Sequence, residues 1–162
     1  MKNPCKFSSG LLLIFLVMTV GCDRKNTSTE LMTQVDKLAT FWNTGNFDGI
    51  ENVLCEDFEI RMSPLYEPEK GIDAFKESVL NTRKSYPDFK ITIDEAFLSN
   101  NAGAGRWTIH ATSKNGTALQ IPGMSILHFV DGKIKDEWIS NNDLLWLKQL
   151  DYSIKPPEVE GK

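Results

Sequence analysis

The sequence predicts a single α+β domain in which helices cover one face of a mostly antiparallel β-sheet. Apolar residues at helical spacing are concentrated before residue 87, whereas residues 88–141 alternate between apolar and polar side chains. A last short segment with helical spacing, 142–150, closes the domain. Helices followed by a run of hairpin-linked strands are typical of this class, and strong curvature of the sheet would leave a pocket between its concave side and the helices.

Three helices and one short strand are predicted before residue 87. The first helix starts after Thr29 as N-cap and stops at Gly45. A short second helix is expected over 47–55, and a third runs from residue 71 to the proline at 87, which cannot continue a helix. Residues 57–63 alternate and predict a strand. The stripe that defines the first helix consists of Leu31, Val35, Leu38, Phe41 and Trp42.

Four strands are predicted after residue 87, over 88–98, 105–113, 123–130 and 133–141. Each of the first two has one apolar and one polar face, as expected for a sheet that is covered on one side. The Asp-Gly pair at 131–132 is a strong signal for a two-residue hairpin between the last two strands. The second half of the domain should therefore be a meander of adjacent strands.

The N-terminal segment 1–21 is predicted to be an export signal. It has a basic start and an apolar run from Leu11 to Val20, which is too short to span a bilayer. Gly21 precedes Cys22 in a pattern that resembles a bacterial lipobox, and this resemblance implies cleavage before Cys22 and a lipid on its thiol. The expected chain is then exported and anchored in the bacterial cell envelope, with a tether at 22–30, a domain at 31–152 and a disordered tail at 153–162. An ordinary secretory signal is the alternative.

Charge and cysteine content exclude several classes of function. Removal of the leader takes two lysines, so 16 basic residues would face 22 acidic ones. An acidic chain without a basic cluster argues against nucleic acid as a partner. Cys55 would be the one cysteine left without a role, so no internal disulfide is expected, and no Cys or His cluster predicts a metal site.

Two adjacent acids, Asp136 and Glu137, are the candidate catalytic residues. Alternation along the strand places Asp136 on the face of Ile134 and Trp138, and places Glu137 on the other face unless a bulge intervenes. A carboxylate held against Trp in a dry pocket has a raised pKa and can exchange protons near neutral pH. Strand geometry slightly favours Asp136. The alternative is a structural acid that pairs with a base such as Arg106 or Lys135.

Two longer segments, "GRWTIHAT" and "VDGKIKDEWISNNDLLWLKQL", resemble the SnoaL-like polyketide cyclase family of the nuclear transport factor 2-like superfamily. The resemblance implies a cone-shaped sheet wrapped around the N-terminal helices, with a short C-terminal helix. It also implies that an acid beside the Trp moves protons in an intramolecular aldol ring closure without metal or cofactor. Glu137 occupies the position directly before Trp138. The sequence departs from the family at Ser125, where cyclases can carry His, and at Asn142, where Asp is common.

Aromatic residues and one histidine are the candidate ligand-binding residues. An indole-lined pocket would suit a flat apolar ligand, although Trp and Phe at helical spacing are also typical of a hydrophobic core. His128 is included because the hairpin places it across from residue 135 or 137. The aromatic candidates are Phe41, Trp42, Tyr66, Trp107 and Trp138.

Two functions remain open at this point. The preferred one is a membrane-tethered domain that binds an apolar small molecule or a partner protein in its pocket. The other is a cofactor-free enzyme, similar to a polyketide (ester) cyclase or an isomerase, that uses Asp136 or Glu137 as general acid and base. A homodimer through the outer face of the sheet is expected for the fold family.

Overall fold

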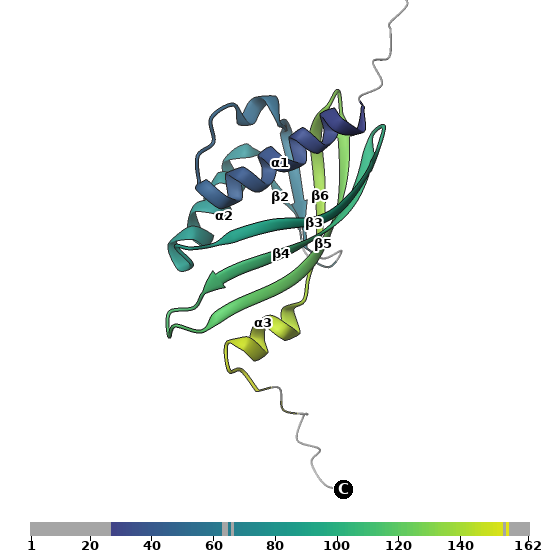
Figure 1. Cartoon of the computed structure of the whole chain (residues 1–162). Coiled ribbons are helices and arrows are strands. Elements are labelled where there is room, and N and C mark those ends of the chain that lie inside the picture. Colours follow the sequence, from purple (N-terminus) through teal and green to yellow (C-terminus); the bar gives the residue numbers. More distant parts are fainter. Residues whose placement is uncertain (1–26, 63–64, 66, 154, 156–162) are drawn as a thin grey trace, which may run out of the picture.

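The computed structural model describes residues 27–62, 65, 67–153 and 155, and confirms the predicted α+β fold. Six strands form one curled, unclosed sheet in the order β2-β1-β6-β5-β4-β3 (Figure 1). Neighbouring strands are antiparallel except β1 and β6, which run parallel. The strands are β1 (Leu54–Arg61), β2 (Glu69–Lys70), β3 (Lys90–Ser99), β4 (Ala102–Thr112), β5 (Ala118–Val130) and β6 (Lys133–Asn141).

Helix α1 (Ser28–Thr44) lies across the sheet and packs on β3 and β6, while α2 (Ile72–Ser85) packs on β1 (Figure 1). The N-cap of α1 is Thr27 rather than Thr29, because Thr27 forms a reciprocal capping box with Glu30. Residues 28–30, expected in the tether, therefore belong to the helix. The predicted stop at Gly45 is confirmed, since Gly45 adopts the left-handed conformation that ends helices, with φ of 68°.

The predicted helix over 47–55 is wrong. Only a 3₁₀ turn, Ile50–Asn52, forms there, and β1 already begins at Leu54. Leu54 pairs with Ile134 of β6, and the Ile134 amide donates to the carbonyl of Val53 at 2.8 Å. Sheet pairing has overridden the local helical spacing of this short apolar segment.

Two amide side chains attach helices to the sheet by imitating a strand. Asn43 of α1 accepts a hydrogen bond from the Ile91 amide at 2.6 Å and donates to its carbonyl at 2.9 Å. Gln149 of the C-terminal helix α3 (Asp143–Gln149) accepts from the Gln120 amide at 2.8 Å and donates to its carbonyl at 3.1 Å. Strand β5 continues beyond its ladder with β6, so Gln149 satisfies backbone groups that β6 does not reach.

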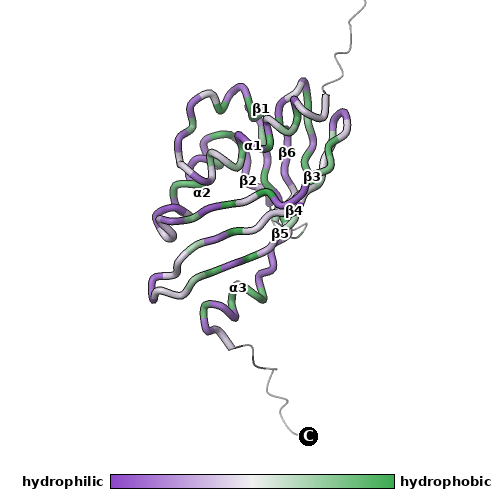
Figure 2. The backbone as a smooth tube through the Cα atoms, viewed as in Figure 1, coloured by the Kyte–Doolittle hydropathy of each residue, from purple (hydrophilic) through white to green (hydrophobic). Residues whose placement is uncertain are grey.

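Side chains of β5 alternate strictly between the covered and the outer face of the sheet. Figure 2 shows hydrophobic and hydrophilic residues interspersed along β4 and β5. One core cluster lies between α1, α2 and the strands β1, β5 and β6, and a second lies around Phe89, Trp107 and Ile121. Residues of both clusters border the cavity described below.

Candidate functional site

A β-bulge in β6 decides which of the two candidate acids faces the interior. Phe129 of β5 pairs with Ile134, but the next residue, His128, pairs with Asp136. The intervening Lys135 is therefore an extra residue, and the alternation of side chains restarts after it. Ile134 and Glu137 both point inward, although they are three positions apart.

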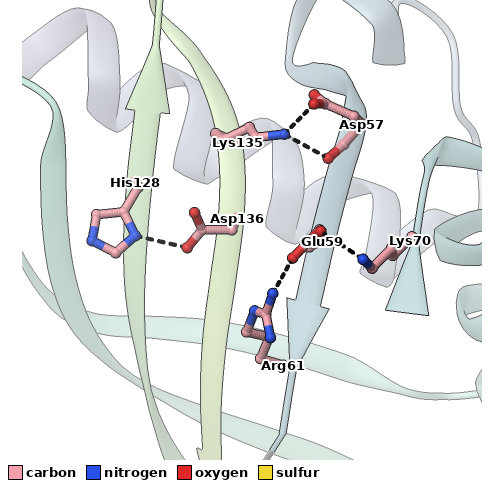
Figure 3. Close-up of polar contacts among 7 residues, drawn as sticks. All are labelled: Asp57, Glu59, Arg61, Lys70, His128, Lys135 and Asp136. Carbon is pink, nitrogen blue, oxygen red and sulfur yellow. Dashed lines mark hydrogen bonds and ion pairs between the residues drawn. The ribbon is translucent and has the colours of Figure 1, made fainter. Parts of the chain in front are cut away.

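The bulged residue is held on the outside by a neighbour on β1. The Lys135 ammonium donates to the Asp57 carbonyl at 2.9 Å and forms an ion pair with the Asp57 carboxylate (Figure 3). Asp57 lies where β1 itself departs from regular pairing with β6, between Leu54 and Glu59. The hydrogen bond from Lys135 lowers the pKa of Asp57 and raises the pKa of Lys135.

Asp136 faces away from the interior, contrary to the prediction from simple alternation. Its Oδ1 lies 2.7 Å from His128 Nδ1, and Figure 3 shows the two side chains pointing toward each other from β6 and β5. Both are on the outer face, so the structure also contradicts the expectation that His128 lines the pocket. The bulge at Lys135 is the physical reason for the first error, and the regular alternation of β5 is the reason for the second.

Trp138, expected in the pocket wall, is also on the outer face. Its ring stacks with Arg61 of β1, whose guanidinium carbon lies 5.4 Å from the ring centroid, and 37% of the residue remains exposed. Arg61 in turn pairs with Glu59, which also contacts Lys70 (Figure 3). This face of the sheet therefore carries the ion pairs, and the other face carries the candidate site.

Glu137 is a buried carboxylic acid with one satisfied and one free oxygen. Only 7% of the residue is exposed, and Ser125 Oγ donates a hydrogen bond to Oε1 at 2.6 Å. The indole Nε1 of Trp107 donates to Ser125 Oγ at 2.8 Å. Oε2 is buried and has no hydrogen-bond partner among the described residues. Burial raises the pKa of Glu137 to about 7, against a smaller lowering by the Ser125 hydrogen bond.

The base partners considered in the sequence are occupied elsewhere. Arg106 forms an ion pair with Glu95, and Lys135 pairs with Asp57. Glu137 therefore has no compensating cation among the described residues, and its desolvation is largely unrelieved. Glu137 is therefore not a structural acid that pairs with Arg106 or Lys135.

Glu137 lies in the wall of a mainly apolar cavity with an empty volume of about 840 Å³, part of which is open to solvent. The cavity is bordered by α1, α2, the strands β3 to β6, the C-terminal helix and Met62, which follows β1. Its polar lining residues are Thr82, Arg106, Ser125, Glu137 and Asn141. A lining of this character, mainly apolar with a few polar groups, is typical of sites for apolar small molecules.

The aromatic candidates divide between the cavity and the core. Trp42 and Trp107 line the cavity as expected. Phe41 instead belongs to the core, where its ring contacts Phe75 and Phe47, because the helical stripe carries it beneath the cavity wall. Tyr66 lies outside the described residues.

Ser125 and Trp146 line the cavity but are not among the predicted ligand-binding residues. Ser125 is the position where the family can carry His, and its inward place in the alternation of β5 was the available signal. Trp146 reaches the cavity from α3, where it also contacts the ring of Tyr86 at 6.1 Å. Helical spacing alone could not show that α3 folds back onto β5 through Gln149.

The leader and Cys22 lie outside the described residues. Of the helices in the described part of the chain, none has both the length and the apolar character that crossing a bilayer requires. None of the curated proteins compared with the chain matches it in sequence.

Comparison with known families and solved structures gives a consistent result. The sequence model of the SnoaL-like polyketide cyclases matches residues 33–150. A protein from Bacillus cereus, provisionally named a polyketide cyclase, is 26% identical, with a TM-score of 0.67 over 76% of this chain and 81% of the other. A provisionally named SnoaL-like cyclase from Jannaschia is 11% identical, with a TM-score of 0.69 and coverage of 83% and 100%.

A further similar structure carries a different functional name. AclR from Streptomyces galilaeus, provisionally named a hydroxylase, is 19% identical, with a TM-score of 0.65 over 82% of this chain and 91% of the other. These likenesses confirm the cone-shaped fold of the nuclear transport factor 2-like proteins. Because one fold supports several reactions, the site must decide the function.

Proposed function

The chain belongs to the SnoaL-like polyketide cyclase family, and from this premise we propose that its cavity binds a neutral, largely apolar carbonyl compound on which Glu137 acts as general acid and base. The observation that supports this proposal is that Glu137 lines the cavity while its buried Oε2 has no hydrogen-bond partner among the described residues. A buried polar atom of this kind costs free energy unless something binds to it. A ligand oxygen or an acidic C–H group would be such a partner.

The acidity of Glu137 suits the proposed chemistry. A pKa of about 7 means that the acid and its conjugate base are both populated near neutral pH. The carboxylate Oε2 would remove a proton from the carbon next to a carbonyl, and the C–H electron pair would move to the carbonyl oxygen to give an enolate. The enolate carbon would then attack a second carbonyl of the same molecule, and Glu137 would return its proton to the new alkoxide.

The ligand class follows from the charge of the lining. The carboxylate of Glu137 has no opposing cation inside, since Arg106 is 58% exposed and pairs with Glu95. The carboxylate of Glu137 would repel an anionic ligand, and the ligand would also lose its hydration without gaining a cation as partner. The indoles of Trp42, Trp107 and Trp146 border the space and favour a flat ring system.

The test uses a simple ketone rather than the unknown substrate. With 2-tetralone in D₂O, the protein should accelerate exchange of the protons next to the carbonyl, followed by proton NMR. Glu137→Gln should reduce the acceleration by roughly two to four orders of magnitude, the range for loss of a general base. Asp136→Asn is the matched control, because it removes the neighbouring acid on the outer face and should keep the activity. Equal acceleration by wild type and Glu137→Gln would contradict the proposal.

A second candidate, binding without turnover, is favoured by the isolation of Glu137. Apart from Glu137, the one titratable residue of the cavity lining in the described part of the chain is Arg106, which is engaged with Glu95. In this case protonated Glu137 would donate a hydrogen bond to a ligand carbonyl. Prodan, a neutral flat fluorescent ketone, should then bind and shift its emission, and Glu137→Leu should weaken binding by about tenfold while the tetralone assay stays silent.

Tethering at the cell envelope is the remaining part of the proposal. Support comes from the apolar run that ends in Gly21 and Cys22. Expression of the full chain in a bacterium should place it in the membrane fraction with a diacylated Cys22, detected by mass spectrometry of the N-terminal peptide. Cys22→Ala should abolish this modification. An unmodified Cys22 in a chain cleaved elsewhere would favour ordinary secretion.

A further inference from the structure

Three side chains from three adjacent strands form one hydrogen-bonded line that ends at the cavity. Trp107 lies on β4, Ser125 on β5 and Glu137 on β6. The line runs from Trp107 Nε1 through Ser125 Oγ to Glu137 Oε1, over distances of 2.8 and 2.6 Å. We propose that Trp107 and Ser125 are positioning residues that fix Oε1 of Glu137 as an acceptor and reserve Oε2 for the proton exchanged with the ligand. This inference rests on the proposed role of Glu137.

The direction of the line follows from donor and acceptor chemistry. An indole N–H can only donate, so Ser125 Oγ must accept from Trp107. The serine hydroxyl has one hydrogen, and within the described residues its acceptor is Glu137 Oε1. Oε1 then accepts in both charge states of the acid. When Glu137 is neutral, its proton must be on Oε2, the atom that has no partner among the described residues.

The indole of Trp107 packs over Gly123 on the neighbouring strand, a residue that has no side chain. Gly123 pairs directly with Trp107 across β4 and β5. A Cβ atom at Gly123 would lie 2.1 Å from Cη2 of the indole, so the ring occupies the space above this glycine. The same packing aims Nε1 along the sheet toward Ser125, two residues further along β5.

The line also gives the acid a defined response to loss of either donor. A hydrogen bond donated to a carboxylate stabilises the charged form, so the Ser125 bond lowers the pKa of Glu137 against the effect of burial. Without Ser125 the pKa should rise by about one unit. Without the Trp107 N–H, the Ser125 hydroxyl can turn and accept from protonated Glu137, which also raises the pKa.

NMR titration tests the line without any substrate. Protein labelled at the glutamate carboxyl carbon should show one resonance with a midpoint near pH 7, assigned by its loss in Glu137→Gln. Ser125→Ala should move this midpoint up by about one unit. Ser125→Thr keeps the hydroxyl and should restore the wild-type midpoint, and Ser140→Ala on the outer face of β6 should not move it. An unchanged midpoint in Ser125→Ala would overturn the inference.

The indole of Trp107 provides a second readout that packing alone would not produce. Its ¹⁵N–¹H resonance, assigned with Trp107→Phe, should titrate with the same midpoint as Glu137, because two hydrogen bonds connect them. In Ser125→Ala this response should disappear, and its persistence would also overturn the inference. A shifted midpoint with no tetralone exchange would refute the proposed catalysis and leave the line intact. If tetralone exchange is lost in Glu137→Gln but unchanged in Ser125→Ala, the proposed catalysis stands and the role of the line is refuted.

Discussion

Asp136 and Glu137 are adjacent in the chain and lie on opposite faces of β6. Asp136 Oδ1 lies 2.7 Å from His128 Nδ1 on the outer face, whereas Glu137 is buried against the cavity with Ser125 as its hydrogen-bond donor. Burial raises the pKa of Glu137 to about 7, so this acid can hold a proton near neutral pH. Two neighbouring carboxylates thus allow a direct comparison of a buried acid with a half-buried one on the outer face.

Removal of the buried acid should change how stability depends on pH. The pKa of Glu137 is raised from 4.5 to about 7 in the folded chain, so the folded state binds more protons than the unfolded state between these values. The free energy of unfolding should therefore fall as pH rises through this window, by roughly 3 kcal/mol in total. Glu137→Gln cannot ionise, and its stability should not show this decrease.

Urea unfolding at pH 5 and pH 8 measures the effect. Glu137→Gln should be close to wild type at pH 5 and more stable than wild type at pH 8. Glu56→Gln is a suitable control, because Glu56 is an exposed acid on β1 and its removal should leave the wild-type difference in place. If the difference in free energy of unfolding between wild type and Glu137→Gln is the same at pH 5 and pH 8, Glu137 is not desolvated as described.

The rate of tetralone exchange should depend on pH with the same midpoint. The active form is the carboxylate of Glu137, so the rate should rise with pH, reach half its maximum near pH 7 and become constant about one pH unit higher. Ser125→Ala should move the rise to higher pH, because it removes the donor that stabilises the carboxylate. A profile that continues to rise toward pH 10 would indicate catalysis by hydroxide and not by Glu137.

The alternation of apolar and polar residues was enough to predict the faces of β4, whose pairing with β5 is regular over the whole ladder. It failed for Asp136 and Trp138 because the bulge at Lys135 has no local signal such as glycine. That bulge depends on an ion pair with Asp57, a residue 78 positions away. The position of the motif correctly indicated Glu137 as the inward acid, because the family pattern places the acid directly before Trp138 and does not rely on regular alternation along the strand.

The hydrogen-bonded line of Trp107, Ser125 and Glu137 could not be predicted from the sequence for a related reason. Trp107 and Ser125 are 18 residues apart, and their contact depends on the register of β4 and β5. Periodicity places both on the inward face and leaves their distance along the strands open. The same limit applies to Trp146, whose place in the cavity is set by the contact of Gln149 with β5.

Substitution of Gly123 should destabilise the domain through the indole of Trp107. Gly123→Ala places a methyl group 2.1 Å from the ring, which forces the ring to move, at a cost of about 1–3 kcal/mol. In a Trp107→Ala background the methyl group meets no ring, and the additional cost should be below about 0.5 kcal/mol. Urea unfolding of the four chains gives the coupling energy. Equal costs in both backgrounds would show that the indole does not occupy this space.

The attachment of α3 should depend on Gln149. This helix has no buried residue, and the Gln149 amide makes two hydrogen bonds to the backbone of Gln120. Gln149→Ala should accelerate hydrogen exchange of the α3 amides by roughly 5- to 30-fold, equivalent to about 1–2 kcal/mol of local stability. Prodan should also dissociate faster, because Trp146 borders the cavity. Lys148→Ala on the exposed side of α3 is the control, and equal exchange in both variants would contradict this attachment.

The outer face of the sheet carries a row of apolar residues that we expect to bind a second copy of the chain. Phe97, Ile126 and Trp138, with exposures of 68%, 52% and 37%, lie in one row across β3, β5 and β6, with Ala104 of β4 between Phe97 and Ile126.

The rows beside it hold acids and bases together, so a second copy turned end for end can place opposite charges in contact. Ile126→Glu introduces a charge at the centre of this row and should convert a dimer to a monomer without loss of the far-UV circular dichroism signal. Thr33→Glu, on the exposed side of α1, should remain dimeric. Sedimentation equilibrium at micromolar concentration distinguishes a dimer from a monomer. A dimer is expected because an exposed apolar row on a sheet face marks a protein–protein contact. A wild-type chain that stays monomeric would refute the expectation.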